Sequence, residues 1–273
     1  MNFRNIIRSA LAEDVGSGDI TTDTIVPEGL KVKAVIVARE AGIVSGLVVA
    51  REVFTVFDPD IEVKAAVIEG EKVKKGTVLL KLKGSARTIL TCERLALNLL
   101  QRLSGISTLT SKYVKKIKPF GVTLLDTRKT TPGLRNLEKY AVKAGGGENH
   151  RMGLYDGTLI KDNHIKIAGS IVNAVNMIKA KYPGELIEVE TQNMKEVEEA
   201  LKSNVDVIML DNMSIQDMKK AIKLINKKCR IEVSGGIDFN SIEKIAGLGV
   251  DYISVGVLTH SAKSFNISLD ILG

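Results

Sequence analysis

Tryptophan is absent from this chain of 273 residues, and aromatic residues make up only 4% of it. The hydrophobic core must therefore be built from aliphatic side chains. The hydrophobic fraction of 44% and the charged fraction of 26% are typical of a soluble globular protein. The length is sufficient for one large domain or for two unequal ones.

Cysteine is also scarce. The chain has 2 cysteines, Cys92 and Cys229, which are far apart and form no CxxC motif. This argues against a disulfide framework and for a reducing compartment. The N-terminal segment lacks the apolar core of a signal peptide, and no apolar run approaches the roughly 18 residues that a membrane span needs. We therefore expect a cytoplasmic protein with no membrane partner.

Acidic residues are fewer than basic ones. The chain has 39 Lys and Arg residues and 32 Asp and Glu residues, which gives a formal net charge of +7. A basic balance suits acidic small ligands or nucleic acid. The sequence shows no basic tract interleaved with aromatic residues, no zinc-ligand spacing and no RNA-binding signature. We therefore expect an acidic small ligand and no nucleic-acid partner.

The cations concentrate in residues 126–165, a stretch that also holds two of the three histidines. A helical pattern between two apolar runs predicts strand, helix and strand at residues 121–126, 134–144 and 157–162. Arg128, Lys129 and Lys161 would then follow the C-terminal ends of two parallel strands, and the loop GGGENHR would approach the same end. Such a cluster predicts a site for one anionic ligand with several charges. The alternative is a solvated basic loop.

From residue 120 onward, strand and helix patterns alternate with short loops, which indicates a parallel sheet with helical crossovers. Polar residues at Asn193, Ser214 and Asn240, each followed three positions later by an acid, mark expected helix starts. Six strands are expected, at residues 121–126, 157–162, 186–190, 205–211, 230–235 and 251–256. The pattern favours an incomplete α/β barrel, and an open doubly wound sheet is the alternative.

Each expected strand ends in polar residues or glycine, and in a barrel these ends share one face. Glu190 and Asp211 follow neighbouring strands opposite the basic cluster, so they are predicted to bind Mg²⁺, which prefers carboxylate oxygens. Helix N-capping is the alternative role for a lone acid. A phosphate-binding cup is predicted from the strand ends at Ser234, Gly235, Gly236 and Gly256, where backbone N–H groups can approach an anion. A plain strand-to-helix turn is the alternative there.

The first 108 residues have a different pattern. Helices are expected at residues 3–13 and 47–57, with an ordered loop between 11 and 27 and a strand from 31. The glycine-punctuated run at 60–90 is similar to biotinyl or lipoyl carrier domains, but no lysine sits in a carrier-type turn, so we interpret it as a structural element. A long helix at 91–118, which Gly105 is expected to break or bend, would link this part to the next.

The stretch RKTTPGLRNLEKYAVKAGGGENHRMGLYDGTLIKDNH resembles the quinolinate phosphoribosyltransferase family. The shorter segments EDVGSGDITT, GIVSGL, ERLALNLLQRLSGIST, EVE, MLDN, EVSGGI and VGVLTHS agree with it, so the resemblance spans most of the chain. It implies an N-terminal α/β sandwich domain at 1–108 and a C-terminal, six-stranded incomplete α/β barrel at 109–273. Whether the chain end at 261–273 packs back on the first domain stays open.

The resemblance implies a transferase that joins quinolinate to 5-phosphoribosyl-1-pyrophosphate (PRPP). The products would be nicotinate mononucleotide, pyrophosphate and CO₂, and the reaction would require Mg²⁺ and serve NAD biosynthesis. It also implies a homodimer or a larger assembly of dimers, such as a hexamer, in which each active site is completed by the neighbouring subunit.

The resemblance further assigns roles to individual residues. Lys129, Glu190 and Asp211 would be catalytic, and the two acids would hold Mg²⁺. The quinolinate carboxylates would be bound by Arg128, His150, Arg151, Lys161 and, from the partner subunit, Arg94. The 5-phosphate of PRPP would be bound by Ser234, Gly235, Gly236, Gly256 and His260. The alternatives are a nicotinate phosphoribosyltransferase, a molybdenum-transport-associated homologue, a phosphosugar isomerase on the same barrel, or a carrier or binding module built on residues 60–90.

Overall fold

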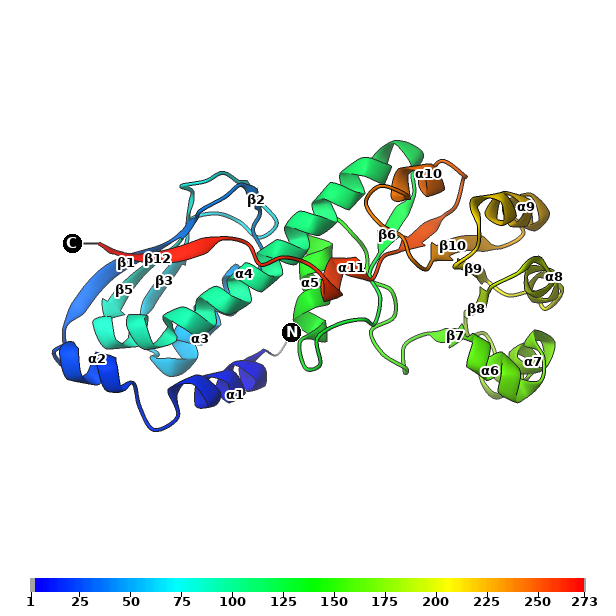
Figure 1. The fold of residues 1–273 in the computed structure, drawn as a ribbon. Coiled ribbons are helices and arrows are strands. Elements are labelled where there is room, and N and C mark those ends of the chain that lie inside the picture. Colours follow the sequence, from blue (N-terminus) through cyan, green and yellow to red (C-terminus); the bar gives the residue numbers. More distant parts are fainter. Residues whose placement is uncertain (1–2, 273) are drawn as a thin grey trace. The chain divides into compact units, whose positions relative to one another are not determined.

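A computed structural model describes residues 3–272 of the chain. The chain divides into two compact units, drawn in Figure 1. The first unit holds the chain up to Ser111, the segment Thr131–Gly146 and the chain from Ser261 onward. The second holds Lys112–Thr130 and Gly147–His260. The predicted boundary at residues 108 and 109 stays a prediction.

The first unit is built on an antiparallel sheet in the order β12-β1-β5-β3. Leu80 and Leu82 of β5 are buried and the lysines between and after them are exposed, so one face of the sheet is covered and the other faces solvent. The strands are β1 (Lys31–Ala38), β3 (Glu62–Ala65), β5 (Val78–Ser85) and β12 (Ile267–Leu272), with a two-stranded sheet of β2 (Gly42–Ile43) and β4 (Lys72–Val73). The last strand of the chain thus pairs with the first.

The helices of this unit are α1 (Arg4–Val15), α2 (Ile20–Ile25), α3 (Leu47–Phe57), α5 (Arg135–Ala144) and most of α4 (Ala86–Ile117). The expectation of a loop at 11–27 was wrong for α2, which Asp19 begins by accepting the N–H of Thr22. The break expected at Gly105 was also wrong, because α4 is continuous. A Cβ at Gly105 would lie 2.0 Å from the carbonyl oxygen of Lys263, so this glycine allows a close backbone approach.

The second unit contains a six-stranded parallel sheet in the order β6-β11-β10-β9-β8-β7. Successive strands are neighbours from β7 to β11, and β6 joins β11, so the chain winds in one direction without the reversal of a doubly wound sheet. This confirms the incomplete six-stranded barrel, with β6 and β7 at its edges (Figure 1). The strands are β6 (Thr123–Leu125), β7 (Thr158–Ile160), β8 (Ile187–Thr191), β9 (Val207–Asp211), β10 (Arg230–Ser234) and β11 (Tyr252–Ser254).

Helical segments connect these strands. Asn193 and Ser214 accept the N–H groups of Glu196 and Asp217, as predicted. Asn240 is not a cap, because Asp238 accepts the N–H groups before the next helix. The segments are η1 (Lys118–Phe120), α6 (Asp162–Ala168), α7 (Ile171–Lys181), α8 (Met194–Lys202), α9 (Ile215–Ile225), α10 (Ile242–Ala246) and α11 (Val257–His260). Between residues 3 and 272, none of the helices has the length and apolar character that a bilayer crossing requires.

Candidate active site

A cavity of about 760 Å³ opens at the C-terminal ends of the barrel strands, all within the second unit. In parallel α/β barrels this end is where active sites lie. Every predicted site residue except Arg94 lines this cavity. They are Arg128, Lys129, His150, Arg151, Lys161, Glu190, Asp211, Ser234, Gly235, Gly236, Gly256 and His260. Arg94 lies on α4 in the first unit and is exposed.

The basic stretch is held in place by Asp126, a fully buried carboxylate at the end of β6. Asp126 accepts hydrogen bonds from Asn149 Nδ2 at 2.5 Å and from the backbone N–H of His150 at 3.0 Å. A parallel bridge between Leu125 and Glu148 adds the same loop to the edge of the sheet. The glycine-rich loop is therefore fixed against β6, which brings His150 and Arg151 to the cavity.

Two arginines meet at one end of the cavity. Burial lowers the pKa of Arg151, and the nearby charge of Arg128 lowers it further. Arg151 Nη1 donates to the carbonyl of Gly157 at 2.9 Å, but the buried Nε atoms of both arginines have no hydrogen-bond partner within residues 3–272. Two close guanidinium groups repel each other, and burying their unpaired donors costs free energy unless an anion binds between them. The pair therefore indicates a ligand with more than one negative charge.

Two predicted metal-binding carboxylates line the same cavity. Lys161 Nζ lies 2.6 Å from Glu190 Oε2, so the Lys161 ammonium serves as the counter-charge of Glu190. Asp211, on the neighbouring strand, accepts from Asn212 Nδ2 at 2.7 Å. Both acids line the cavity and offer oxygen ligands, the donor type that Mg²⁺ prefers. The donor set fits a magnesium ion that keeps most of its waters. Glu190 Oε2 is bound to the Lys161 ammonium, so the ion would replace Lys161 there or bind the other carboxylate oxygen.

The predicted phosphate-binding residues, three of which are glycines, line the same cavity. Gly235 has φ +88°, and a Cβ there would lie 2.3 Å from Asn212 Oδ1, so only glycine fits. At Gly256 a Cβ would meet the side chains of Lys129 and His260 at 3.0 and 3.2 Å. After Gly235 and Gly236 the next helix, α10, begins only at Ile242, whereas the short α11 begins at Val257, directly after Gly256. Backbone N–H groups are the available donors at these glycines.

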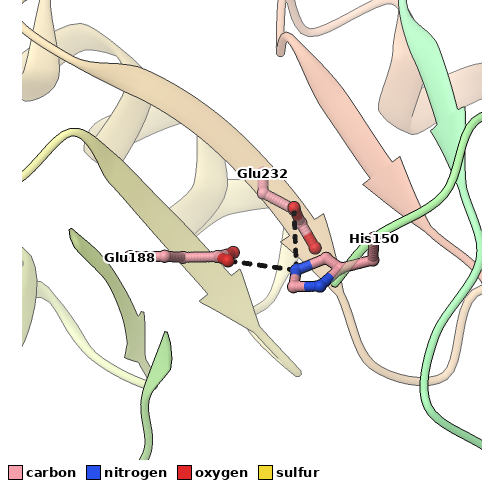
Figure 2. A group of neighbouring side chains, drawn as sticks. All are labelled: His150, Glu188 and Glu232. Carbon is pink, nitrogen blue, oxygen red and sulfur yellow. Dashed lines mark ion pairs between the residues drawn. The ribbon is translucent and has the colours of Figure 1, made fainter. Parts of the chain in front are cut away.

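The sequence prediction did not include Glu188 and Glu232 among the site residues. Their carboxylates both lie beside Nε2 of the His150 ring (Figure 2). Each lies two positions before a predicted site residue on the same strand, Glu190 or Ser234, and therefore on the same face. The period-2 spacing from Glu190 and Ser234 was the signal that could have identified them.

The barrel and its cavity define an enzyme that binds ligands with several negative charges. Family models for the quinolinate phosphoribosyl transferase N-terminal and C-terminal domains match residues 19–104 and 106–270. A Bacillus subtilis protein named probable nicotinate-nucleotide pyrophosphorylase [carboxylating] is 42% identical over 273 residues, covering 99% of this chain and 94% of that protein. A Synechocystis protein of the same name is 44% identical, with coverage of 96% and 90%.

The solved structure of the nicotinate-nucleotide pyrophosphorylase from Francisella tularensis has a TM-score of 0.95 to this chain at 43% identity, with coverage of 98% of this chain and 95% of that one. The chain belongs to the quinolinate phosphoribosyl transferase family. The resemblance noted in the sequence is thereby confirmed.

Proposed function

We propose that the chain transfers the 5-phosphoribosyl group of PRPP to quinolinate with loss of one carboxylate. The products are nicotinate mononucleotide, pyrophosphate and CO₂, and the nucleotide serves NAD synthesis. The observation that carries this proposal is the convergence of Arg128 and Arg151 on a cavity that is also lined by Gly235, Gly236 and Gly256. The arginines suit a dicarboxylate and the glycines suit a phosphate.

Quinolinate has two neighbouring carboxylates on a planar ring. The forked guanidinium groups of Arg128 and Arg151 match carboxylates in geometry, and their unpaired Nε atoms are available as donors. His150 and Lys161 line the same end of the cavity. Nicotinate has one carboxylate and would leave part of this positive charge without a counter-charge, so the arginine pair favours quinolinate.

The 5-phosphate of PRPP is assigned to Ser234, Gly235, Gly236, Gly256 and His260, and the pyrophosphate to the side of Lys129. The main chain of Lys129 is anchored, because Thr259 Oγ1 donates to its carbonyl at 2.7 Å. Glu190 and Asp211 would hold Mg²⁺, which when bound neutralises charge on the leaving pyrophosphate. The same two carboxylates would stabilise positive charge that develops at the ribose C1 atom.

The chemistry then has two steps. The quinolinate nitrogen bonds to C1 of the ribose while the bond from C1 to the pyrophosphate oxygen breaks, and Lys129 stabilises the departing oxygen. The ring nitrogen is then cationic, so the bond from C2 to its carboxylate breaks with the electron pair left on C2. CO₂ leaves and C2 takes up a proton. The work of the protein is mainly electrostatic, through preorganised charges around both ligands.

The proposal includes a homodimer or an assembly of dimers in the reducing cytoplasm, in which Arg94 reaches the active site of the partner subunit. Arg94 is exposed, and its side chain makes no ion pair or hydrogen bond within residues 3–272. A second cavity of about 750 Å³ in the second unit is bordered by the exposed apolar side chains of Tyr155, Ile167 and Met177, a pattern common at interfaces. Both cysteines are free thiols, which suits a reducing compartment.

Subunit sharing can be tested by mixing two inactive variants, Arg94→Met and Asp211→Asn. A mixed dimer would hold one site with an intact Asp211 and an intact Arg94 from the other chain. Recovery of activity after the variants are unfolded and refolded together would support the proposal. Full activity in a chain shown to be monomeric by light scattering would contradict it.

The activity itself is tested by offering quinolinate and nicotinate in parallel with PRPP and Mg²⁺, and separating the products by chromatography. We expect nicotinate mononucleotide from quinolinate alone. Turnover of nicotinate but not of quinolinate would contradict the proposal. Glu190→Ala and Asp211→Ala should each lower the rate by about 10²–10³. Rates near wild type in both variants would overturn the magnesium assignment.

A further inference from the structure

A buried cluster lies directly beneath the proposed quinolinate end of the cavity. His150 Nε2 is 3.0 Å from Glu188 Oε2 on β8 and 3.7 Å from Glu232 Oε2 on β10 (Figure 2). The side chains of His150 and Glu188 are each 12% exposed and that of Glu232 is 2% exposed. Three ionisable side chains packed together inside a barrel are costly, so the arrangement calls for a function.

The opposite ring nitrogen of His150 identifies where the ring proton lies. His150 Nδ1 accepts the backbone N–H of Arg151 at 2.8 Å. A nitrogen that accepts a hydrogen bond carries no proton, so the proton of the neutral ring must be on Nε2. There it points at Glu188 and is donated to that carboxylate. The ring is therefore fixed from both sides, by its own main chain and by the two acids.

His150, Glu188 and Glu232 also lie close enough to share a metal ion, because their ligand atoms are all within 4.8 Å of one another. A metal on Nε2 would require the proton to move to Nδ1, where a ligating histidine normally donates to an acceptor. Here Nδ1 faces the Arg151 N–H, which is a donor. The hydrogen-bond geometry thus favours a proton over a metal ion at the centre of the cluster.

The charges of the cluster agree with this arrangement. Burial raises the pKa of Glu232 to about 8, and the negative charge of Glu188 acts in the same direction. The charged form of Glu232 is therefore disfavoured beside Glu188. Glu188 supplies a negative charge that raises the pKa of Arg151 and so stabilises the guanidinium next to Arg128.

We propose that Glu188 and Glu232 are positioning residues for quinolinate binding, which hold the His150 ring in its Nε2–H form and so orient His150 and Arg151 toward the carboxylates of the substrate. Glu188 is the principal member, because it accepts the ring proton and balances the charge of Arg151. Glu232 is the second member, and its carboxylate approaches the same ring nitrogen from β10. This inference rests on the proposed function, since it concerns the binding of quinolinate.

The test compares Glu188→Gln, Glu232→Gln and the wild-type chain, with Glu198→Gln as the control. Glu198 is an exposed acid on α8 of the same unit, so its substitution removes one negative charge without touching the cluster. All three substitutions conserve side-chain size, and thermal unfolding identifies any variant that is poorly folded. Steady-state kinetics give the KM for quinolinate, the KM for PRPP and kcat separately.

Glu188→Gln should raise the KM for quinolinate about tenfold or more, while the KM for PRPP stays within about twofold, because a charge-assisted hydrogen bond is lost at one end of the cavity only. Glu232→Gln should raise the KM for quinolinate by a smaller factor than Glu188→Gln does, since Glu232 Oε2 lies 3.7 Å from His150 Nε2 and Glu188 Oε2 lies 3.0 Å from it. A purely structural role would change both KM values and kcat together.

A second readout is independent of turnover. Nitrogen-15 and carbon-13 NMR of histidine-labelled protein distinguishes the two ring tautomers, and His150→Gln assigns the signal among the three histidines. We expect His150 to be neutral with its proton on Nε2. A proton on Nδ1, or an unchanged quinolinate KM in an active Glu188→Gln chain, would overturn this inference alone. Failure of the wild-type chain to turn over quinolinate would instead overturn the proposed function.

Discussion

Arg128 offers a prediction in which substrate binding and protein stability respond differently to one substitution. Its guanidinium lies close enough to Arg151 to lower the pKa of that group, and its buried Nε has no hydrogen-bond partner within residues 3–272. In the free protein the Arg128 charge is therefore mainly repulsive. In the complex it would pair with a carboxylate of quinolinate, so its loss should weaken binding without destabilising the free protein.

The size of the effect follows from the contacts that are lost. A hydrogen bond to a charged group contributes about 1.5–3 kcal/mol, and the fork of an arginine can make two. Arg128→Met should therefore weaken quinolinate binding by about 3 kcal/mol, or roughly 150-fold. Arg128→Lys keeps the charge but loses the fork, so about a tenfold loss is expected. The free energy of unfolding should stay within about 0.5 kcal/mol of wild type, because relief of repulsion offsets lost packing.

Calorimetric titration with quinolinate gives the binding constants, and urea denaturation without ligand gives the stability. Lys219→Met, an exposed charge on α9, is the control for the loss of one positive charge and should leave both unchanged. Wild-type affinity in Arg128→Met would refute the assignment of this arginine. A large loss of stability in the free protein would refute the argument that the pair is repulsive without its ligand.

Three further predictions concern buried groups. Glu138→Gln should lower the free energy of unfolding, measured by urea denaturation, by about 2–3 kcal/mol, because the fully buried Glu138 accepts hydrogen bonds from Nε and Nη2 of Arg102. An unchanged urea midpoint would contradict this. Gly105→Ala should lower the free energy of unfolding by about 1–3 kcal/mol, since the new Cβ would overlap the Lys263 carbonyl. A variant with the thermal stability of the wild type would show that the backbone at Lys263 moves away without cost. The pKa of Glu232 is raised from 4.5 to about 8, so the folded protein keeps a proton that the unfolded chain releases, and wild-type stability should fall as pH rises between these values. Glu232→Gln should gain relative stability by up to about 1.4 kcal/mol per pH unit in this window, and parallel pH profiles of the two proteins would contradict the shift.

Local pattern was sufficient to predict the barrel strands, because each is a short apolar run that ends in polar residues or glycine. The caps at Asn193 and Ser214 were predictable for the same reason, since the side chain bonds to an N–H three residues away. The error at Asn240 shows the limit of such patterns. Asp238 lies two residues earlier, and its side chain accepts the N–H groups of Asn240 and Ser241.

The role of Gly105 was not visible in the sequence. Within a helical pattern a glycine indicates a weak point. The close approach of the Lys263 carbonyl explains why a glycine is needed there without any bend. That contact joins positions more than 150 residues apart in the sequence, so local pattern cannot reveal it.

Some cavity residues, such as Lys161 and Glu190, were predicted because charged side chains at strand ends share one face of a barrel. Others, such as His260, were assigned only by the family resemblance. The groups beneath them were not included. Asp126 opens the basic stretch, yet only the structure reveals that it holds the loop carrying His150. Glu188 and Glu232 appear in the sequence as ordinary strand residues, and their meeting at His150 depends on β8, β10 and the loop coming together.

The most direct test of the account uses quinolinate labelled with carbon-13 in its 2-carboxylate, together with PRPP and Mg²⁺. The account predicts one labelled CO₂ for each pyrophosphate released, unlabelled nicotinate mononucleotide, and no CO₂ when PRPP is omitted. Label retained in the nucleotide, or CO₂ released without PRPP, would contradict the claim that this cavity joins phosphoribosyl transfer to decarboxylation.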